Sequence, residues 1–305
     1  MTAITLAHFS DPHLAYQPQL SLLQRFSKRQ LSALSWARGR RKSQQHDLLE
    51  RLVADVRAHA PDHWAITGDI GNFSLPGEFP LAASWLRSLA PASQVSVVPG
   101  NHDALVALEH ARGWGLWQPW MSNDDGSESW PYVRERGDIA LIGVSSALPT
   151  LPLLASGRVG EAQLARLEQQ LRDLGARGLC RVLMIHHPVA AGAISYRKAL
   201  RDADALRAVI GRAGVELLLH GHARDARLDA LAGPAGVVPV LGLPSASAVP
   251  SARDAGARWQ WLRISRRDDG AGWNLEQRVR VWGAAAQAFV GAGRYRFQLP
   301  VQRAG

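Results

Sequence analysis

The chain of 305 residues contains a single cysteine, Cys180, and no apolar run long enough to cross a membrane. One cysteine gives no disulfide within the chain, which fits a reducing cytosol. Cys180 lies in the apolar run 179–185, so we expect a small buried side chain there and not a nucleophile. The N-terminus also lacks the basic region, apolar run and cleavage site of a secretory signal, so we expect a cytoplasmic protein.

Acidic residues are absent between Pro12 and His46. The same stretch carries seven cations: Arg25, Lys28, Arg29, Arg38, Arg40, Arg41 and Lys42. This segment accounts for most of the formal net charge of +9, since 9 − 7 leaves only +2 elsewhere. Because the basicity is local, the high isoelectric point does not by itself indicate a nucleic-acid partner.

The arrangement of apolar runs predicts an α/β fold. Hydrophobic residues make up 47% of the chain and charged residues 20%, which is typical of a folded globular protein. Strands are expected at 4–9, 63–67, 95–98, 132–136, 139–144, 181–185 and 215–219, and helices at 47–60, 79–89, 160–174 and 200–212. Alternating strands and helices, followed by a strand-rich end, favour two stacked sheets flanked by helices.

Other segments are less regular. Residues 113–130, rich in Trp, Gly and Asp, favour a loop, and the strand-rich part at 225–305 includes an Ala/Gly-biased loose connection at 284–293. No internal repeat or interdomain linker is found in the sequence. We therefore expect a single domain over 1–305, with the basic segment 20–42 as an insertion.

Five short polar blocks follow the apolar runs in a fixed order. They are Asp11-Pro12-His13, Gly68-Asp69, Gly100-Asn101-His102-Asp103, His186-His187 and His220-Gly221-His222. Side chains at i and i+2 of a strand share a face, so Asp11 and His13 can reach one ion together. The carboxyl ends of strands in open α/β sheets border the crevice where ligands bind. The ordered set therefore predicts a two-metal centre.

Such a centre suits the cleavage of phosphate esters. Two divalent ions about 3.5–4 Å apart can neutralise an anionic diester, generate hydroxide near pH 7 and stabilise the entering and departing oxygens. Asp69 suits a bridging carboxylate, and imidazole and carboxamide ligands favour Mn, Fe or Zn over Ca or Mg alone. His102, beside Asn101, is placed to protonate the leaving alcohol. We expect a metal-dependent phosphoesterase that acts on a small phosphoester, most of all by phosphodiester hydrolysis.

The order D-x-H, GD, GNH[DE], H and GHxH resembles the calcineurin-like metallophosphoesterase superfamily, specifically its bacterial cyclic-nucleotide phosphodiesterase-like branch, from Ile4 to Arg224. The resemblance implies a four-layer αββα sandwich of two mixed β-sheets flanked by helices, and a dinuclear centre. It implies that the first ion is held by Asp11, His13 and Asp69, and the second by Asp69, Asn101, His186 and His222, with His102 as the catalytic histidine.

The sequence departs from this pattern at its last position. The final histidine of GHxH is Arg224, a permanent cation that cannot ligate a metal. Three interpretations stay open: the first ion binds weakly, which we favour, or His220 compensates, or Arg224 holds the substrate phosphate. Of the pair His186 and His187, His186 directly follows the apolar strand and is taken as the ligand, which leaves His187 to face substrate or solvent.

The basic segment 20–42 directly follows the first predicted strand, which places it near the rim of the site. Its apolar residues recur near helical spacing among the cations: Leu20, Leu22, Leu23, Phe26, Leu31, Leu34 and Trp36. Such a helix either packs on the domain or lies on an anionic membrane, at the inner face of the bilayer. Nucleic-acid binding has less support, because no aromatic stacking platform or reader motif is found.

Two alternatives to the phosphodiesterase follow. The basic segment favours a membrane-associated hydrolase of a lipid-linked pyrophosphate, whereas Arg224 favours a non-catalytic scaffold with a degenerate metal site. Against the scaffold, the other expected ligands and His102 are all present in the sequence.

Overall fold

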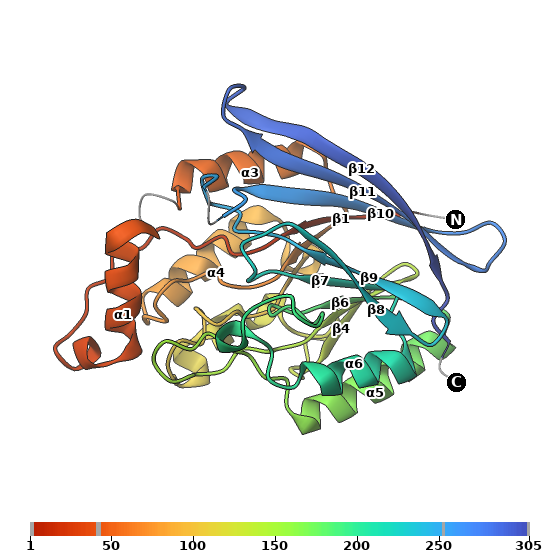
Figure 1. The fold of residues 1–305 in the computed structure, drawn as a ribbon, viewed down its shortest axis with the longest axis horizontal. Coiled ribbons are helices and arrows are strands. Elements are labelled where there is room, and N and C mark those ends of the chain that lie inside the picture. Colours follow the sequence, from red (N-terminus) through yellow and green to blue (C-terminus); the bar gives the residue numbers. More distant parts are fainter. Residues whose placement is uncertain (1–2, 41–43, 252–253, 304–305) are drawn as a thin grey trace.

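The computed structural model describes residues 3–40, 44–251 and 254–303. Two six-stranded sheets face each other, and helices cover their outer sides (Figure 1). Both sheets mix parallel and antiparallel neighbours, which confirms the predicted sandwich of two mixed sheets flanked by helices.

The first sheet has the strand order β12-β11-β10-β1-β2-β3. Its strands are β1 (Ile4–Phe9), β2 (His63–Ile66), β3 (Val95–Val97), β10 (Arg258–Arg266), β11 (Gly272–Gly283) and β12 (Ala288–Pro300). Strands β1, β2 and β3 are parallel, whereas β10 runs antiparallel to β1. The helices α3 (His46–Ala58) and α4 (Glu78–Leu89) pack on this sheet, through the Trp259 indole bonded to Asp55 and through Trp85 against Phe9.

The second sheet has the order β4-β5-β6-β7-β9-β8. Its strands are β4 (Tyr132–Arg136), β5 (Ile139–Gly143), β6 (Cys180–Met184), β7 (Leu217–His220), β8 (Arg227–Gly233) and β9 (Gly236–Gly242). Strands β5, β6, β7 and β9 are parallel. The helices α5 (Glu161–Ala176) and α6 (Ala203–Ala213) cover its outer face. In each sheet, the loops that follow the parallel strands lie at the same edge, where the carboxyl ends of these strands meet.

The side chains of β6 point alternately into two hydrophobic cores. Cys180, Val182 and Met184 belong to the core that lies between the sheets, whereas Leu183 and Ile185 pack in the core under α5 and α6. This is the period of two expected of a strand that is buried on both faces. Cys180 is completely buried, which agrees with the expected role as a small apolar side chain.

Two sequence predictions about irregular segments were right only in part. Within 113–130 the chain forms a 3₁₀ helix, Trp114–Trp120, whose Trp117 is fully buried and donates to the Phe79 carbonyl at 3.0 Å. The large tryptophan side chains fill the core there, although the residues next to them in the sequence are of the types common in turns. Residues 284–287 form the expected connection as a turn, but β12 begins at Ala288 and pairs with β11, so 288–293 belong to a strand. Strand pairing uses backbone groups, so small side chains do not prevent it.

The basic segment is divided into short helices at the end of the sandwich where β1 ends (Figure 1). They are η1 (Leu23–Phe26), α1 (Lys28–Ser35) and the single π turn η2 (Trp36–Arg40); residues 41–43 of the predicted insertion lie outside the described part of the chain. The buried face of α1 is polar: Arg29 donates to the Phe73 carbonyl at 3.3 Å, and Ser32 donates to the Asn72 carbonyl at 3.0 Å. In the described ranges, no helix has both the length and the apolar character needed to span a bilayer.

A buried ion pair joins the second sheet to its helices and to the C-terminal segment. Arg181 contacts Glu216 at 2.8 Å and 3.0 Å, and donates at 2.8 Å to the backbone carbonyls of Leu171 and Ala213. It also donates to the carbonyl of Gln302, whose own N–H donates to Glu216 at 3.0 Å. Both charged side chains are almost completely buried.

We expect the substitution Arg181→Met to destabilise the protein by about 3–5 kcal/mol, because it leaves the Glu216 carboxylate buried without its partner. The free energy of unfolding in urea measures this effect. Arg177→Met is the matched control, since Arg177 pairs with Glu135 at the exposed surface and its loss should change stability little. Equal effects of the two substitutions would contradict the proposed anchoring role.

Candidate metal centre

The five polar blocks of the sequence meet at one place. Each follows a parallel strand, β1, β2, β3, β6 or β7, at its carboxyl end. Two groups of potential ligands form there, each with donor atoms within 4.8 Å of one another: His13, Asp69 and His102, and Asp69, His186 and His222. Asp69 belongs to both groups, so its carboxylate lies where a bridging ligand would be needed.

The backbone at these positions is bent into an uncommon conformation. Asp11, His13, Asp69 and His222 have φ angles of 50°, 44°, 54° and 66°, in the left-handed region that residues other than glycine rarely adopt. Such strain persists only where the surrounding structure enforces it, and it is typical of functional sites. At Gly100 a Cβ atom would lie 2.2 Å from Asp69 Oδ1, so only glycine allows this approach.

Four imidazoles of the centre each place one ring nitrogen against a backbone carbonyl. The pairs are His13 Nδ1 with Gly71 O (3.1 Å), His102 Nδ1 with Asn72 O (2.8 Å), His186 Nδ1 with Thr67 O (2.7 Å) and His222 Nε2 with Lys198 O (3.2 Å). Because a carbonyl only accepts, each of these nitrogens carries the proton, and the second nitrogen is the one suited to bind a metal or exchange a proton. Metal-binding histidines are typically oriented in this way.

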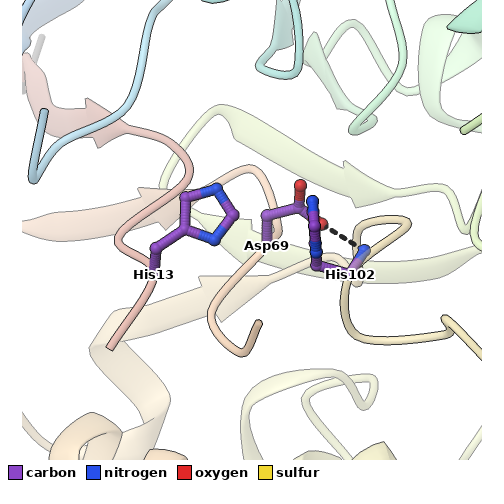
Figure 2. Close-up of side chains that lie close together, drawn as sticks. All are labelled: His13, Asp69 and His102. Atoms are coloured by element: carbon purple, nitrogen blue, oxygen red, sulfur yellow. Dashed lines mark hydrogen bonds between the residues drawn. The ribbon is translucent and has the colours of Figure 1, made fainter. Parts of the chain in front are cut away.

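Asp69 is the centre of the cluster. Its Oδ1 accepts from the backbone N–H of His102 at 2.7 Å (Figure 2). Its Oδ2 lies 3.4 Å from His186 Nε2. Figure 2 also shows the rings of His13 and His102 on the two sides of this carboxylate. The two rings are nearly perpendicular, with centroids 5.1 Å apart.

Asp11 and Asn101 are the two remaining metal ligands that the family resemblance implies. Asp11 accepts from the backbone N–H of His222 at 3.1 Å and lies 3.6 Å from His186 Nδ1. The Asn101 amide oxygen lies 3.3 Å from His186 Nε2. The structure therefore brings together all seven residues predicted as metal ligands or acid, and their individual roles stay predictions.

The electrostatics of the cluster favour a cation. Burial raises the pKa of Asp11 to about 7, since the carboxylate has lost water. Burial acts to raise the pKa of Asp69 as well, yet His186 and His102 hold it well below its usual range. Burial acts to lower the pKa of His186, but Asp69 and Asp11 raise it to about 9. The carboxylates of Asp69 and Asp11 thus stabilise positive charge at His186, and carboxylate and imidazole donors of this kind fit a metal centre.

The other candidate residues, His187, His220 and Arg224, lie outside the two ligand groups. His187 is buried behind the cluster, and its ring nitrogens meet Ser146 Oγ at 2.7 Å and the Ala155 carbonyl at 3.2 Å. His220 is also completely buried, with Nδ1 2.9 Å from the Gly221 carbonyl. Burial lowers the pKa of His187 to about 3 and that of His220 to about 4, so both rings are neutral near pH 7. Arg224 is exposed and lines the cavity beside the centre.

A cavity of about 670 Å³ opens over the cluster. Besides Asp11, His13, Asp69, Asn101, His102 and His222, its wall contains the cations Arg38, Lys198 and Arg224 and the apolar side chains Leu31, Leu34 and Leu153. A volume of this size is typical of small-molecule sites. No sequence signal predicts Lys198 or Leu153 as site residues, because neither lies next to one of the five polar blocks.

Asp103 has a positioning role that the motif analysis missed. Its carboxylate accepts from the backbone N–H groups of Gly71 and Gly100, both at 2.8 Å, and of Ile70 at 3.3 Å. It thereby joins the loop that carries Asp69 to the loop that carries Asn101. The sequence feature that could have identified Asp103 is its place directly after Asn101 and His102 in the third polar block.

Comparisons with known structures reveal the same architecture. A dimetal phosphatase from Danio rerio is 12% identical, with a TM-score of 0.64 over 97% of this chain and 98% of that chain. The purple acid phosphatase PPD1 from yellow lupin (Lupinus luteus) is also 12% identical, with a TM-score of 0.61 over 97% of this chain and 54% of that one. At such low identity the similarity shows the fold alone.

Sequence comparison gives the family. No curated protein matches the chain. The family model described as calcineurin-like phosphoesterase, however, matches residues 4–223. This range contains both ligand groups and covers most of the molecule, and the chain therefore belongs to the calcineurin-like phosphoesterase family.

Proposed function

We propose that this metal-dependent phosphoesterase hydrolyses phosphodiesters, with two divalent ions, Mn, Fe or Zn, bound through Asp69. The observation that supports this most directly is the membership of Asp69 in two groups of ligand atoms, each within 4.8 Å. Bound there, two ions supply positive charge for the phosphate and lower the pKa of the attacking water. Mixed imidazole, carboxylate and carboxamide donors suit Mn, Fe or Zn.

The residues of the chain have separate parts in this reaction. His13, Asp11 and Asp69 would hold the first ion, and Asp69, Asn101, His186 and His222 the second. Arg38, Lys198 and Arg224 give the cavity wall positive charge for the free oxygens of the phosphate. A diester carries two substituents on phosphorus, and the 670 Å³ cavity is lined beyond the ligand groups by residues of other segments, among them Leu31 and Ser251.

His102 is the proposed general acid. Its Nδ1 is engaged by the Asn72 carbonyl, so Nε2 is the nitrogen that can give a proton to the leaving oxygen.

The substitution His102→Ala should lower kcat by about 10²–10⁴-fold for a diester with an alkoxide leaving group. The loss should be much smaller for a p-nitrophenyl diester, because p-nitrophenolate departs without a proton. Steady-state kinetics on the two substrates, with metal content measured in parallel, tests this. His110→Ala is the control, since His110 is exposed and lies outside both ligand groups. Equal losses on both substrates would exclude the acid role.

Asp69→Ala should remove both ions and abolish turnover, because the two ligand groups share this carboxylate. Elemental analysis of the purified protein and a diester assay with added Mn²⁺ measure the two effects. Asp204→Ala, on the exposed surface of α6, should change neither. If the wild-type protein binds metal but cleaves nothing in a broad panel of phosphoesters, the non-catalytic scaffold would be the better interpretation.

We further propose that the first ion binds more weakly than the second, since Arg224 stands where the family pattern has a ligand histidine. Arg224→His should raise the metal content of the protein toward two ions per chain. Arg224→Gln is the matched control, because it removes the cation without adding an imidazole. Elemental analysis after dialysis distinguishes them. Nearly two ions in both the wild-type and the Arg224→His protein would show that no ligand is missing.

A lipid-linked pyrophosphate is the second candidate substrate class. The specific support is the apolar part of the cavity wall, Leu31, Leu34 and Leu153, which lines the same cavity as Lys198. An acyl or isoprenoid chain would pack on these leucines while its phosphates face the cations and the metal ligands. Comparing kcat/KM for a lipid-linked pyrophosphate and a water-soluble diester of the same head group distinguishes the two classes.

A further inference from the structure

Large apolar side chains are exposed on three segments, one of which lines the cavity through Leu153. They are Leu22, Leu23 and Phe26 on and beside η1, Leu151 and Leu153 on the loop 150–154, and Tyr196 on the 3₁₀ helix η6 (Tyr196–Lys198). Phe26 is 93% exposed and Leu23 86%, so their side chains contact almost nothing in the protein. We call these six residues the apolar rim. Contiguous exposed apolar groups of this kind are typical of interaction surfaces.

Hydrogen bonds join the three segments of the apolar rim. The Lys28 ammonium donates to the Leu154 carbonyl at 2.7 Å and to the Thr150 hydroxyl, which connects α1 to the loop 150–154. Arg197 of η6 donates to the Leu153 carbonyl at 3.1 Å, and its own carbonyl accepts from Ala155 N–H at 2.9 Å. The apolar side chains are therefore held on a connected framework, and Leu153 is held there with a φ of 67°.

The apolar rim is continuous with the candidate active site. Leu153 belongs to the rim and also lines the cavity, next to Ala155 and Lys198. Leu31 and Leu34 of α1 extend this apolar surface inward. The Ala155 carbonyl also meets His187 Nε2 at 3.2 Å, directly behind His186 and His222. An amphiphile lying across the rim would thus have its polar end at the metal ligands.

The three stretches of sequence that carry the apolar rim contain cations and no acidic residues. Each rim segment lies in a stretch of sequence without Asp or Glu: 12–46, 139–160 and 174–201. Exposed cations lie in these stretches at Arg25, Arg38, Arg158, Arg197 and Arg201, and Arg197 contacts the rim directly through the Leu153 carbonyl. Arg201 stacks on the Tyr196 ring at 4.3 Å, which keeps its charge beside an exposed aromatic side chain. Apolar side chains ringed by cations complement a surface that is anionic outside and apolar beneath.

We propose that the apolar rim docks on an anionic phospholipid bilayer, with Leu22, Leu23, Phe26 and Leu151 inserted at the boundary of head groups and acyl chains. The bordering arginines then meet lipid phosphates, and the mouth of the cavity faces the head-group layer. A nucleic acid would satisfy the arginines but would leave the six apolar side chains without a partner. Docking goes beyond the proposed reaction and does not depend on it, because membrane binding requires no turnover.

Vesicle flotation with the full chain tests the proposal. We expect the protein to float with vesicles of phosphatidylcholine and phosphatidylglycerol, and to stay unbound with phosphatidylcholine alone. The double substitution Leu23→Glu/Phe26→Glu should lower the bound fraction about tenfold or more, since binding scales with the apolar area inserted. Leu151→Glu, on a separate segment, should weaken binding in the same direction.

The matched control is Leu228→Glu/Val237→Glu, which replaces two exposed apolar side chains on β8 and β9, outside the apolar rim, with the same charge. It should float with anionic vesicles like the wild-type protein, apart from the small effect of added negative charge. Thermal unfolding and metal content of all variants confirm that the fold is intact.

Three results would overturn the proposal. The first is no flotation of the wild-type protein with anionic vesicles. The second is equal binding by the rim variant and the control variant, since the arginines alone would then account for the attraction. The third is equal binding of the wild-type protein to neutral vesicles. A failure to cleave diesters, by contrast, would leave the flotation results unchanged, so the docking surface and the proposed reaction can fail separately.

Discussion

The centre depends on imidazoles that are fixed by backbone carbonyls around one shared carboxylate. His13, His102, His186 and His222 each give a ring proton to a carbonyl, so each has one defined nitrogen left for the chemistry. Three of these carbonyls, at Thr67, Gly71 and Asn72, belong to the loop after β2 that also carries Asp69. A single loop therefore sets the tautomers of three histidines as well as the position of the carboxylate they surround.

The rest of the fold keeps that loop in place. Parallel pairing of β1 with β2 and of β2 with β3 brings the loops after these strands to one edge, and Asp103 then joins two of them through three backbone N–H groups. The left-handed backbone at Asp11, His13, Asp69 and His222 costs about 1–3 kcal/mol per residue. Burial of both sheets against α3, α4, α5 and α6 supplies the stability that maintains this strain.

The parts of the site that the sequence predicted are those with a local signal. Asp69 and Asn101 each directly follow an apolar strand, and parallel strands leave little freedom in where such residues meet. Lys198 has no such signal, because only the packing of η6 against the loop 150–154 brings it to the cavity. The helix Trp114–Trp120 was missed for a related reason: Trp117 becomes core only through its contact with Phe79, which lies far away in the sequence.

Arg224 changes how positive charge is distributed around the substrate. At the end of the GHxH pattern a histidine would add to the metal shell, whereas the exposed Arg224 adds its charge to the cavity wall, in common with Lys198 and Arg38. A weakly held first ion and a fixed guanidinium are alternative sources of charge for the same phosphate. Fixed cations at the mouth also suit a substrate that arrives by way of an anionic surface, because they meet its phosphate before the metal ligands do. Under the proposed function, an arginine at this position and the cationic, apolar cavity wall would be parts of one adaptation to the way the substrate reaches the site.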